Sequence, residues 1–351
     1  MAKLDNPAVP KGSTVLVTGV NGFIGSHVAN QFVHYGYKVR GTVRDTAKNA
    51  WISTYFDKTY GPGNFELVSV PDMTVEGAYA EAAKGVAAVV HVASVMSFDP
   101  DPNKVIPTAV AGAVTALKAA YAEPSVKRFV LTSSSSATLP AGKEAYAEGR
   151  VITEKTWSED AVALAWAPPP YTPDRSSAVY SASKVEAEQA VWKYHEENKA
   201  KRPDLVVNTV LPNMNFGKSL DPVNQGHASS SGLIPMLWQG ATLPPPFHDP
   251  QYFIDVEDTG RLHVAAAILP DVKSERIFGF AEPINWDKVL AVLRKQNPGH
   301  KFAENFAGAP YASEIKPRDR AEQLLREIGR PGWTSLEDSI LNNTEDLRAA
   351  S

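Results

Sequence analysis

A tyrosine and a lysine stand four residues apart in Tyr180-Ser-Ala-Ser-Lys184, within a stretch whose apolar pattern predicts a helix over residues 177–198. Residues four apart lie on one face of a helix, so we expect the phenol and the ammonium on the same side. A phenol has a reference pKa of about 10, and a neighbouring ammonium lowers it by favouring the phenolate. The pair therefore suits proton exchange with a carbonyl or alcohol oxygen. The same spacing also occurs on solvated helix faces, and this alternative stays open.

Four consecutive serines, Ser133 to Ser136, follow an apolar segment that predicts a strand over residues 128–132. Ligands of doubly wound sheets bind beyond the carboxyl ends of the strands. A hydroxyl at that edge can donate a hydrogen bond to a reacting oxygen. The alternative is a serine-rich loop that caps the next element.

Three glycines, Gly19, Gly22 and Gly25, follow a buried strand predicted over residues 15–18, and an apolar helical period begins at Phe23 and Ile24. Such a turn lets backbone N–H groups approach a pyrophosphate at the positive end of a helix. The spacing is G-x-x-G-x-x-G and not the G-x-G-x-x-G of the standard dinucleotide fingerprint, so a plain turn is the alternative. Its place directly behind an apolar strand favours dinucleotide binding.

Strands and helices alternate through the first 211 residues. Further strands are predicted over residues 37–44, 65–70, 86–93, 128–132 and 204–211, and helices from residue 45 and over residues 76–84, 105–122 and 177–198. Near-continuous apolar strands that alternate with helices predict an α/β fold with a doubly wound parallel sheet of the Rossmann type.

The second half is expected to form a smaller lobe. Proline and glycine interrupt its short elements, and helices are expected over residues 255–269, 286–296, 318–328 and 335–342. We expect residues 1–211 to be mainly the Rossmann domain, with an excursion at residues 137–177 over the site. Residues 212–351 should be mainly a substrate-binding lobe, interleaved with the first domain.

Composition narrows the class of protein. The 351 residues carry a net charge of −4 and no long basic run, which gives no electrostatic case for nucleic acid or an anionic membrane. The absence of cysteine excludes disulfides, thiolate catalysis and cysteine-ligated metal. The eight histidines lack metal-ligand spacing, so no metal is expected. A polar N-terminal stretch and the lack of a membrane-length apolar run indicate a soluble, cytoplasmic protein.

The glycine turn, the serines and Y-x-x-x-K, in this order, resemble the extended short-chain dehydrogenase/reductases over nearly the whole chain. The shared motifs are Thr18-Gly19-x-x-Gly22-x-x-Gly25, Pro71-Asp72-Met73, His91-Val92-Ala93-Ser94, Leu131-Thr132-Ser133-Ser134, Tyr180-Ser-Ala-Ser-Lys184 and Leu211-Pro212-Asn213. Three further segments, Val39-Arg-Gly-Thr-Val-Arg44, Val126-Lys-Arg-Phe-Val-Leu-Thr-Ser-Ser134 and Arg330-Pro-Gly-Trp333, are similar to dihydroflavonol-reductase-like enzymes. The nearest resemblance is to fungal NADPH-dependent aldehyde and ketone (carbonyl) reductases.

The resemblance implies roles for individual residues. Ser134 and Tyr180 would be catalytic, with Tyr180 the proton donor, and Lys184 would hold the nicotinamide ribose and lower the pKa of the tyrosine. Arg44 and Lys48 would face the 2′-phosphate of NADPH. The implied cofactor-binding set is Gly19, Asn21, Gly22, Phe23, Ile24, Gly25, Arg44, Lys48, Asp72, Met73, Val92, Ala93, Ser94, Thr132, Tyr180, Lys184, Pro212, Asn213, Met214, Asn215 and Ser230, with Ser229 and Ser231 as alternatives to Ser230. The substrate set is Phe98, Ser134, Tyr180, Met214, Trp238 and Gln251.

Two departures from the family pattern bear on the mechanism. Extended members commonly carry asparagine in the helix before the fifth strand, where Thr115 stands here, so a proton relay through that position is in doubt. Asp45 directly follows Arg44, and an acid at this place can bind the ribose 2′-hydroxyl of NAD. Use of both cofactors therefore stays open.

The sequence thus predicts an NADPH-dependent carbonyl reductase that acts on small-molecule aldehydes and ketones. A sugar epimerase or hydroxysteroid dehydrogenase is the alternative within the superfamily, and a non-catalytic NADP-sensing regulator is the alternative outside enzymes. Sugar nucleotides need a polar diphosphate site, whereas residues 244–247 (Pro-Pro-Pro-Phe) and Tyr252 suggest an apolar mouth. The oligomeric state is not predicted.

Overall fold

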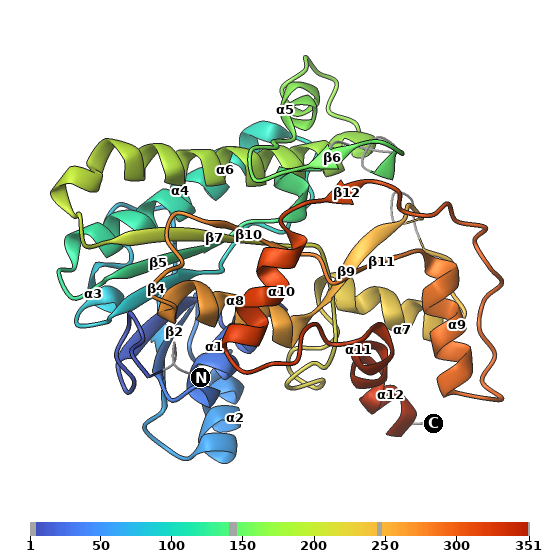
Figure 1. The fold of residues 1–351 in the computed structure, drawn as a ribbon, viewed down its shortest axis with the longest axis horizontal. Coiled ribbons are helices and arrows are strands. Elements are labelled where there is room, and N and C mark those ends of the chain that lie inside the picture. The colour runs from blue at the N-terminus through green and yellow to red at the C-terminus, as the bar shows by residue number, and fades with distance from the viewer. Residues whose placement is uncertain (1–4, 140–145, 244–247, 350–351) are drawn as a thin grey trace.

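A central parallel sheet organises the chain in the computed structural model, which describes residues 5–139, 146–243 and 248–349. Its seven strands lie in the order β10-β7-β5-β4-β1-β2-β3, and every neighbouring pair is parallel (Figure 1). The strands are β1 (Thr14–Thr18), β2 (Lys38–Val43), β3 (Phe65–Ser69), β4 (Ala88–His91), β5 (Arg128–Thr132), β7 (Val206–Pro212) and β10 (Arg276–Gly279). The predicted doubly wound sheet is confirmed.

Helices cover both faces of this sheet, which explains why its strands are apolar on both sides. Alternate residues of β1 enter different cores: Val15 and Val17 pack with the cluster around α1 and α8, and Leu16 packs with the cluster around α4 and α6. The helices of the first part are α1 (Phe23–His34), α2 (Ala50–Tyr60), α3 (Ala80–Ala83), α4 (Pro102–Ala122), α5 (Glu159–Ala165) and α6 (Ser176–Asn198).

The second half of the chain is divided between a smaller lobe and the main sheet. A three-stranded sheet in the order β11-β9-β8 lies with α7, α9 and α11 beside the main sheet, whereas α8 and β10 return to the main sheet (Figure 1). Its elements are α7 (Leu233–Trp238), α8 (Val256–Ile268), α9 (Trp286–Gln296), α10 (Arg318–Glu327), α11 (Leu336–Asn343), α12 (Glu345–Ala349), β8 (Met214–Phe216), β9 (Gln251–Asp255) and β11 (Glu282–Ile284). A short pair, β6 (Val151–Ile152) and β12 (Glu314–Ile315), ties the excursion to the C-terminal part. The division at residue 211 stays a prediction.

Three helix starts differ from the expectation. The helix expected from residue 45 begins at Ala50, after a turn at residues 46–49. The helix expected over residues 76–84 is only α3, because Gly77 has φ +78° and interrupts the backbone before it. The helix expected from residue 105 begins at Pro102, since the Asp101 carboxylate accepts a hydrogen bond from the Asn103 N–H and so caps its N-terminus.

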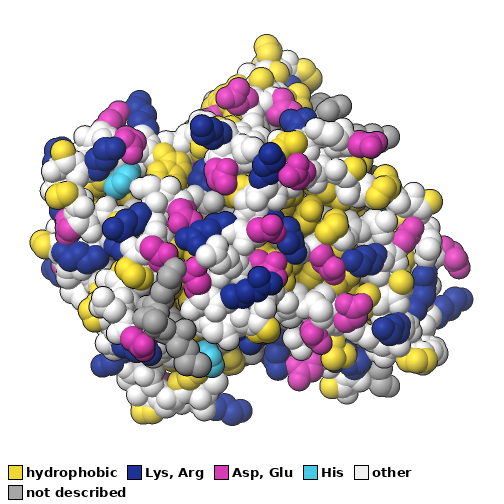
Figure 2. All heavy atoms as spheres, viewed as in Figure 1, with side chains coloured by type: hydrophobic (Ala, Val, Ile, Leu, Met, Phe, Trp, Pro, Cys, Tyr) yellow, Lys and Arg dark blue, Asp and Glu magenta, His cyan; other side chains and the backbone are white. Residues whose placement is uncertain are grey.

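Charges of both signs are mixed on the viewed face (Figure 2), and the long apolar helix α4 is packed inside the protein. Figure 2 shows Lys and Arg interspersed with Asp and Glu over the face viewed in Figure 1. In the described part of the chain, α4 is the one helix long and apolar enough to cross a membrane by composition, but 56% of its most apolar window is buried inside the protein. Its packing against α6 identifies α4 as a core helix.

Three buried histidines predict that the fold is sensitive to mild acid. Burial lowers the pKa of His27 and His263 to about 4 and that of His91 to about 3, so all three stay neutral in the folded chain. Unfolding lets them take up protons below pH 6.5, which destabilises the fold as pH falls. Burial raises the pKa of Asp255 to about 7, so this carboxyl releases a proton on unfolding. That release offsets the proton taken up by one of the three histidines. The net uptake of about two protons should lower the free energy of unfolding by roughly 2–3 kcal/mol per pH unit between about pH 6 and pH 5.

The urea midpoint at pH 6.5 and at pH 5 measures this expectation. His34→Asn, at an exposed histidine, is the control and should keep the same pH dependence. Equal midpoints at the two pH values would contradict the assignment of neutral, buried imidazoles.

Candidate active site

The three residues expected to be catalytic converge at the carboxyl edge of the sheet. Tyr180 and Lys184 lie on α6, and Ser134 follows the end of β5. Ser134 lies close enough to Tyr180 to lower the pKa of its phenol, and the Ser134 hydroxyl accepts a hydrogen bond from the Ser136 N–H at 3.1 Å. The Lys184 Nζ lies 5.8 Å from the centre of the Tyr180 ring and donates to the Ser94 Oγ at 3.0 Å.

The electrostatics of this cluster differ in one respect from the expectation. Burial raises the pKa of Tyr180, and the cause that lowers it is the hydrogen bond with Ser134, not the ammonium of Lys184. The ammonium points to Ser94, which leaves its influence on the phenol weak in this structure. Burial also lowers the pKa of Lys184 to about 8, and the carboxylate of Glu188 opposes that shift.

A threonine at the end of β1 fixes the segment that follows β4. The Thr18 Oγ1 accepts hydrogen bonds from the Val92 and Ala93 N–H groups, both at 3.0 Å, and is hydrogen-bonded to the His91 Nδ1 at 3.0 Å. This arrangement holds Val92 to Ser94 beside the glycine turn. Sequence reasoning did not single out Thr18 for this role, although it was quoted as part of the glycine motif.

The glycine turn has the shape that a pyrophosphate requires. Gly19 has φ +68°, and a Cβ on Gly25 would lie 2.1 Å from the Gly19 carbonyl oxygen, so side chains are excluded at both places. The N-terminus of α1 begins after Gly22 with no side-chain cap and no acidic residue in its first turn. Its N–H groups are therefore free to bind an anion. Gln225, which sequence reasoning missed, donates to the Asn21 carbonyl at 3.3 Å and to the Ser26 Oγ at 2.9 Å.

An asparagine after β7 presents an unpaired donor. Asn213 is buried, its Oδ1 accepts from the Met214 N–H at 2.8 Å, and its Nδ2 has no partner among the described residues. A buried amide donor without a partner is costly, so this atom fits a ligand oxygen. The unpaired Asn213 donor and the uncapped α1 terminus are features that fit a dinucleotide.

Two residues of the predicted cofactor set have their hydroxyls engaged by the protein. The Ser230 Oγ accepts from the Asn215 N–H at 3.0 Å and donates to the Asn215 carbonyl at 2.9 Å. The Thr132 Oγ1 is hydrogen-bonded to the His263 Nε2 at 2.7 Å. Both side chains support the site from behind. Of the alternatives, Ser231 is buried and donates to the Ala228 carbonyl, and Ser229 is exposed.

The predicted 2′-phosphate residues lie directly after β2. Arg44 is exposed, and its guanidinium has no ion pair within the described part of the chain. Asp45 is engaged in its own turn, where Oδ1 accepts from the Lys48 N–H at 3.1 Å and Oδ2 lies 3.8 Å from the Lys48 Nζ. After the next strand, β3, the Asp72 Oδ1 accepts hydrogen bonds from the Thr74 N–H and Oγ1, and Met73 packs against Gly112 of α4.

The residues expected to border the substrate lie in different parts of the structure. Phe98 stacks on the Tyr180 ring with centroids 5.1 Å apart, so it borders the cluster directly. Met214 and Gln251 lie at the starts of β8 and β9. Trp238 is buried in the core of the C-terminal lobe, where its ring packs against His300 and Phe302. The expected apolar mouth at residues 244–247 lies outside the described residues.

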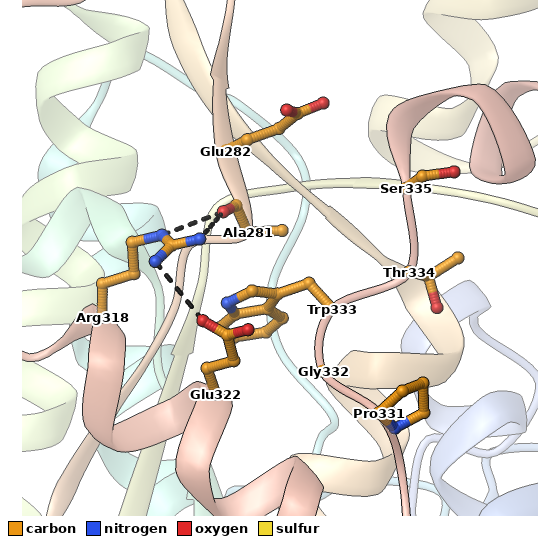
Figure 3. Close-up of a pocket in the computed structure, with 9 residues that line it drawn as sticks. All are labelled: Ala281, Glu282, Arg318, Glu322, Pro331, Gly332, Trp333, Thr334 and Ser335. Carbon is orange, nitrogen blue, oxygen red and sulfur yellow. Dashed lines mark hydrogen bonds and ion pairs between the residues drawn. The ribbon is translucent and has the colours of Figure 1, made fainter.

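A cavity of about 340 Å³ lies away from this cluster, between α10, residues 281–282 and residues 331–335 (Figure 3). None of the residues that line it belongs to the predicted site. Arg318, its cation, donates to the Ala281 carbonyl at 2.9 and 2.7 Å and pairs with Glu322 at 3.5 Å, so the charge is already neutralised. Within residues 5–139, 146–243 and 248–349 there is also no group of three His, Asp or Glu side chains that could hold a metal.

Comparison with known proteins gives concordant matches. The family described as "NAD dependent epimerase/dehydratase family" matches residues 15–274. The chain is 43% identical over 344 residues to aldehyde reductase 2 of Sporidiobolus salmonicolor, covering 97% of each chain. It is 40% identical over 347 residues to ketoreductase adrE of Penicillium rubens, covering 97% of this chain and 98% of the relative. The solved structure of Gre2 in complex with NADPH from Candida albicans matches with a TM-score of 0.82 and 25% identity, covering 97% of this chain and 99% of that one.

Proposed function

The chain belongs to the NAD dependent epimerase/dehydratase family, and on this premise we propose that it is an NADPH-dependent carbonyl reductase that converts aldehydes and ketones to alcohols. The observation that carries the proposal is the convergence of Ser134, Tyr180 and Lys184 beside an open glycine turn. Relatives over nearly the full chain named aldehyde reductase and ketoreductase support this activity.

The protein groups are placed to act on a carbonyl oxygen. The Ser134 hydroxyl and the Tyr180 phenol, which lie close enough to influence each other, can both donate to that oxygen. Tyr180 then gives up its proton as the oxygen becomes an alkoxide. The ammonium of Lys184, 5.8 Å from the ring centre and donating to Ser94, would stabilise the phenolate that remains if it turned from Ser94 towards the phenol oxygen.

The nicotinamide cofactor supplies the hydride that reduces the carbonyl carbon. The open α1 terminus and the glycine turn would hold its pyrophosphate, and the unpaired Asn213 Nδ2 would meet a polar group at its far end. Arg44 and Lys48 would bind the 2′-phosphate that distinguishes NADPH, which the NADPH-bound Gre2 structure supports.

The alternatives have less support. A non-catalytic NADP sensor has no need to bring Ser134 and Lys184 close to Tyr180, and the named relatives are reductases. For an epimerase of sugar nucleotides, the site would need cations for a second diphosphate. Phe98, stacked on Tyr180, instead presents an aromatic surface next to the reacting position, which favours apolar carbonyl compounds.

One assay tests the proposal. The purified protein is incubated with NADPH and a panel of aliphatic aldehydes, aromatic ketones and β-keto esters, with UDP-glucose as a separate arm, and the loss of NADPH absorbance is followed. We expect turnover with carbonyl compounds and none with the sugar nucleotide. Conversion of UDP-glucose without reduction of any carbonyl would reject the reductase.

Phe98 is expected to control substrate preference. It is 45% exposed and stacks on Tyr180, so a bound carbonyl compound must lie against it. Phe98→Ala should alter enantioselectivity or the ranking of substrates by kcat/KM, while the KM for NADPH stays within about twofold. Met96→Ala is the matched control, since Met96 is 46% exposed on the same segment. A change confined to the KM for NADPH would overturn this assignment.

For location and partners we propose a cytoplasmic enzyme whose partner is a small-molecule carbonyl compound. The support is a cysteine-free composition, which suits a reducing compartment, and the mixed charges of the surface (Figure 2). Neither nucleic acid nor membrane is a proposed partner.

A further inference from the structure

A buried carboxylate lies below the reacting groups and has no part in the proposed chemistry. Glu188 is on α6, four residues after Lys184 and eight after Tyr180, so it shares their side of the helix. Its residue is 0% exposed. A buried charge of this kind is strongly unfavourable unless it is paired and hydrogen-bonded, so its partners show what it holds.

Both oxygens of Glu188 are fully engaged. Oε1 accepts from the Thr209 Oγ1 at 2.8 Å, the Arg276 Nε at 2.8 Å and the Trp192 Nε1 at 3.2 Å. Oε2 accepts from the Ser133 Oγ at 2.7 Å and the Arg276 Nη2 at 3.2 Å. One carboxylate therefore joins α6 to the residue after β5, the middle of β7 and the start of β10.

Arg276 completes this link. Its side chain is 7% exposed, and the group that does not bind Glu188 donates to the Glu154 and Thr156 carbonyls at 2.7 and 2.9 Å. Its guanidinium lies 3.7 Å from the centre of the Trp157 ring. The Glu188–Arg276 ion pair therefore also holds residues 154–157, which belong to the segment 137–177 that was predicted to cross over the site.

Ser133 connects the hydrogen bonds of Glu188 to Ser134, the proposed catalytic serine. Its N–H donates to the Val210 carbonyl at 2.8 Å and its hydroxyl to Glu188, so both its main chain and its side chain are fixed. The next residue is Ser134, in extended conformation with φ −157° and ψ 153°, whose hydroxyl meets Tyr180. The two hydroxyls that would bind the carbonyl oxygen come from different elements, and the Ser133–Glu188 hydrogen bond holds these elements together.

We propose that Glu188 is a positioning residue for the reduction: locked by Arg276, it sets the position of Ser134 relative to Tyr180 by holding Ser133 against α6. The inference rests on the proposed reductase function. It assigns no proton transfer to Glu188 and predicts that only those contacts of Glu188 that lead to Ser134 affect turnover.

A matched pair of variants tests this. Ser133→Ala and Thr209→Val each remove one neutral hydroxyl donor to Glu188, at 2.7 and 2.8 Å, but only Ser133 adjoins Ser134. Both should lower the thermal midpoint by a similar amount. Ser133→Ala should lower kcat about tenfold with an unchanged Kd for NADPH, because small displacements of reacting groups are costly. Thr209→Val should keep kcat within about twofold. Equal kcat effects of the two variants would overturn the proposal.

Glu188→Gln adds a readout that a purely structural residue would not move. The carboxylate raises the pKa of Lys184, so its loss should shift the alkaline limb of kcat/KM to lower pH. Glu188→Gln leaves Arg276 without a counter-charge. If this variant fails to fold, the comparison of Ser133→Ala with Thr209→Val decides the question.

Crystal structures of the cofactor-free variants give an answer independent of activity. The distance between the Ser134 and Tyr180 hydroxyl oxygens should increase in Ser133→Ala and stay as in the wild type in Thr209→Val, and an unchanged distance in both would refute the positioning role. If the wild-type protein reduces no carbonyl compound, the proposed function is rejected. The crystal structures of the variants would still test whether Glu188 positions Ser134.

Discussion

Tyr180→Phe should lower kcat for carbonyl reduction by about 10²–10⁴ while the Kd for NADPH stays within about twofold, since this is the usual contribution of a positioned general acid. The variant removes one oxygen and keeps the ring that stacks on Phe98 at 5.1 Å. The proton donor and one of the two hydrogen bonds to the substrate oxygen are lost together. Ser134 and Lys184 remain in place, so residual turnover would reflect hydride transfer without that proton.

Tyr194→Phe is the matched control for this experiment. Tyr194 lies on the same helix, α6, and its ring packs against Tyr121. Loss of its hydroxyl should leave kcat unchanged, and both variants should bind NADPH, measured by its fluorescence, as the wild type does. Turnover near the wild-type level in Tyr180→Phe would remove this tyrosine from the mechanism.

The parts of the site that the sequence predicted are those encoded by local spacing. Tyr180 and Lys184 face one side because a helix repeats every 3.6 residues. Gly19 and Gly25 are needed within one short turn, and each is required by a contact made inside that turn or with the adjacent strand. The sheet itself could be predicted because parallel strands covered on both faces are apolar without interruption.

The parts that were missed depend on contacts between distant segments. Glu188 occurs at the next four-residue step after Lys184, which was a usable signal, but its partners Ser133 and Arg276 are 55 and 88 residues away in sequence. Gln225 reaches the glycine turn over 204 residues. No local pattern encodes such pairings.

Two expectations about individual side chains show the same limit. Trp238, which was predicted to border the substrate, is buried with its ring against His300 and Phe302, and its substrate role stays a prediction. The pKa of Tyr180 was expected to be lowered by Lys184, whereas burial dominates and raises it. The direction of the ammonium, towards Ser94, is set by tertiary structure and is absent from the spacing.

Cofactor selectivity should depend on the residue just after β2. NADPH and NADH differ only in the phosphate on the adenine ribose, so discrimination must come from groups that face it. Arg44 is exposed there with a guanidinium suited to a phosphate, and Asp45 is engaged by Lys48 within its own turn. The engaged Asp45 carboxylate is less available to a ribose hydroxyl, which favours NADPH.

Arg44→Ala is therefore expected to raise the KM for NADPH by roughly ten- to a hundredfold with little change for NADH, since a charged hydrogen bond contributes about 1.5–3 kcal/mol and about 1.4 kcal/mol is tenfold. Lys38→Ala, which removes an exposed cation at the opposite end of the same strand, is the control and should change neither value. High salt should narrow the preference of the wild type, because exposed charges are screened. The measurement is kcat/KM for both cofactors in all three proteins. A wild type that prefers NADH, or an Arg44→Ala variant that loses both cofactors equally, would show that Asp45 or the turn itself determines selectivity and not the arginine.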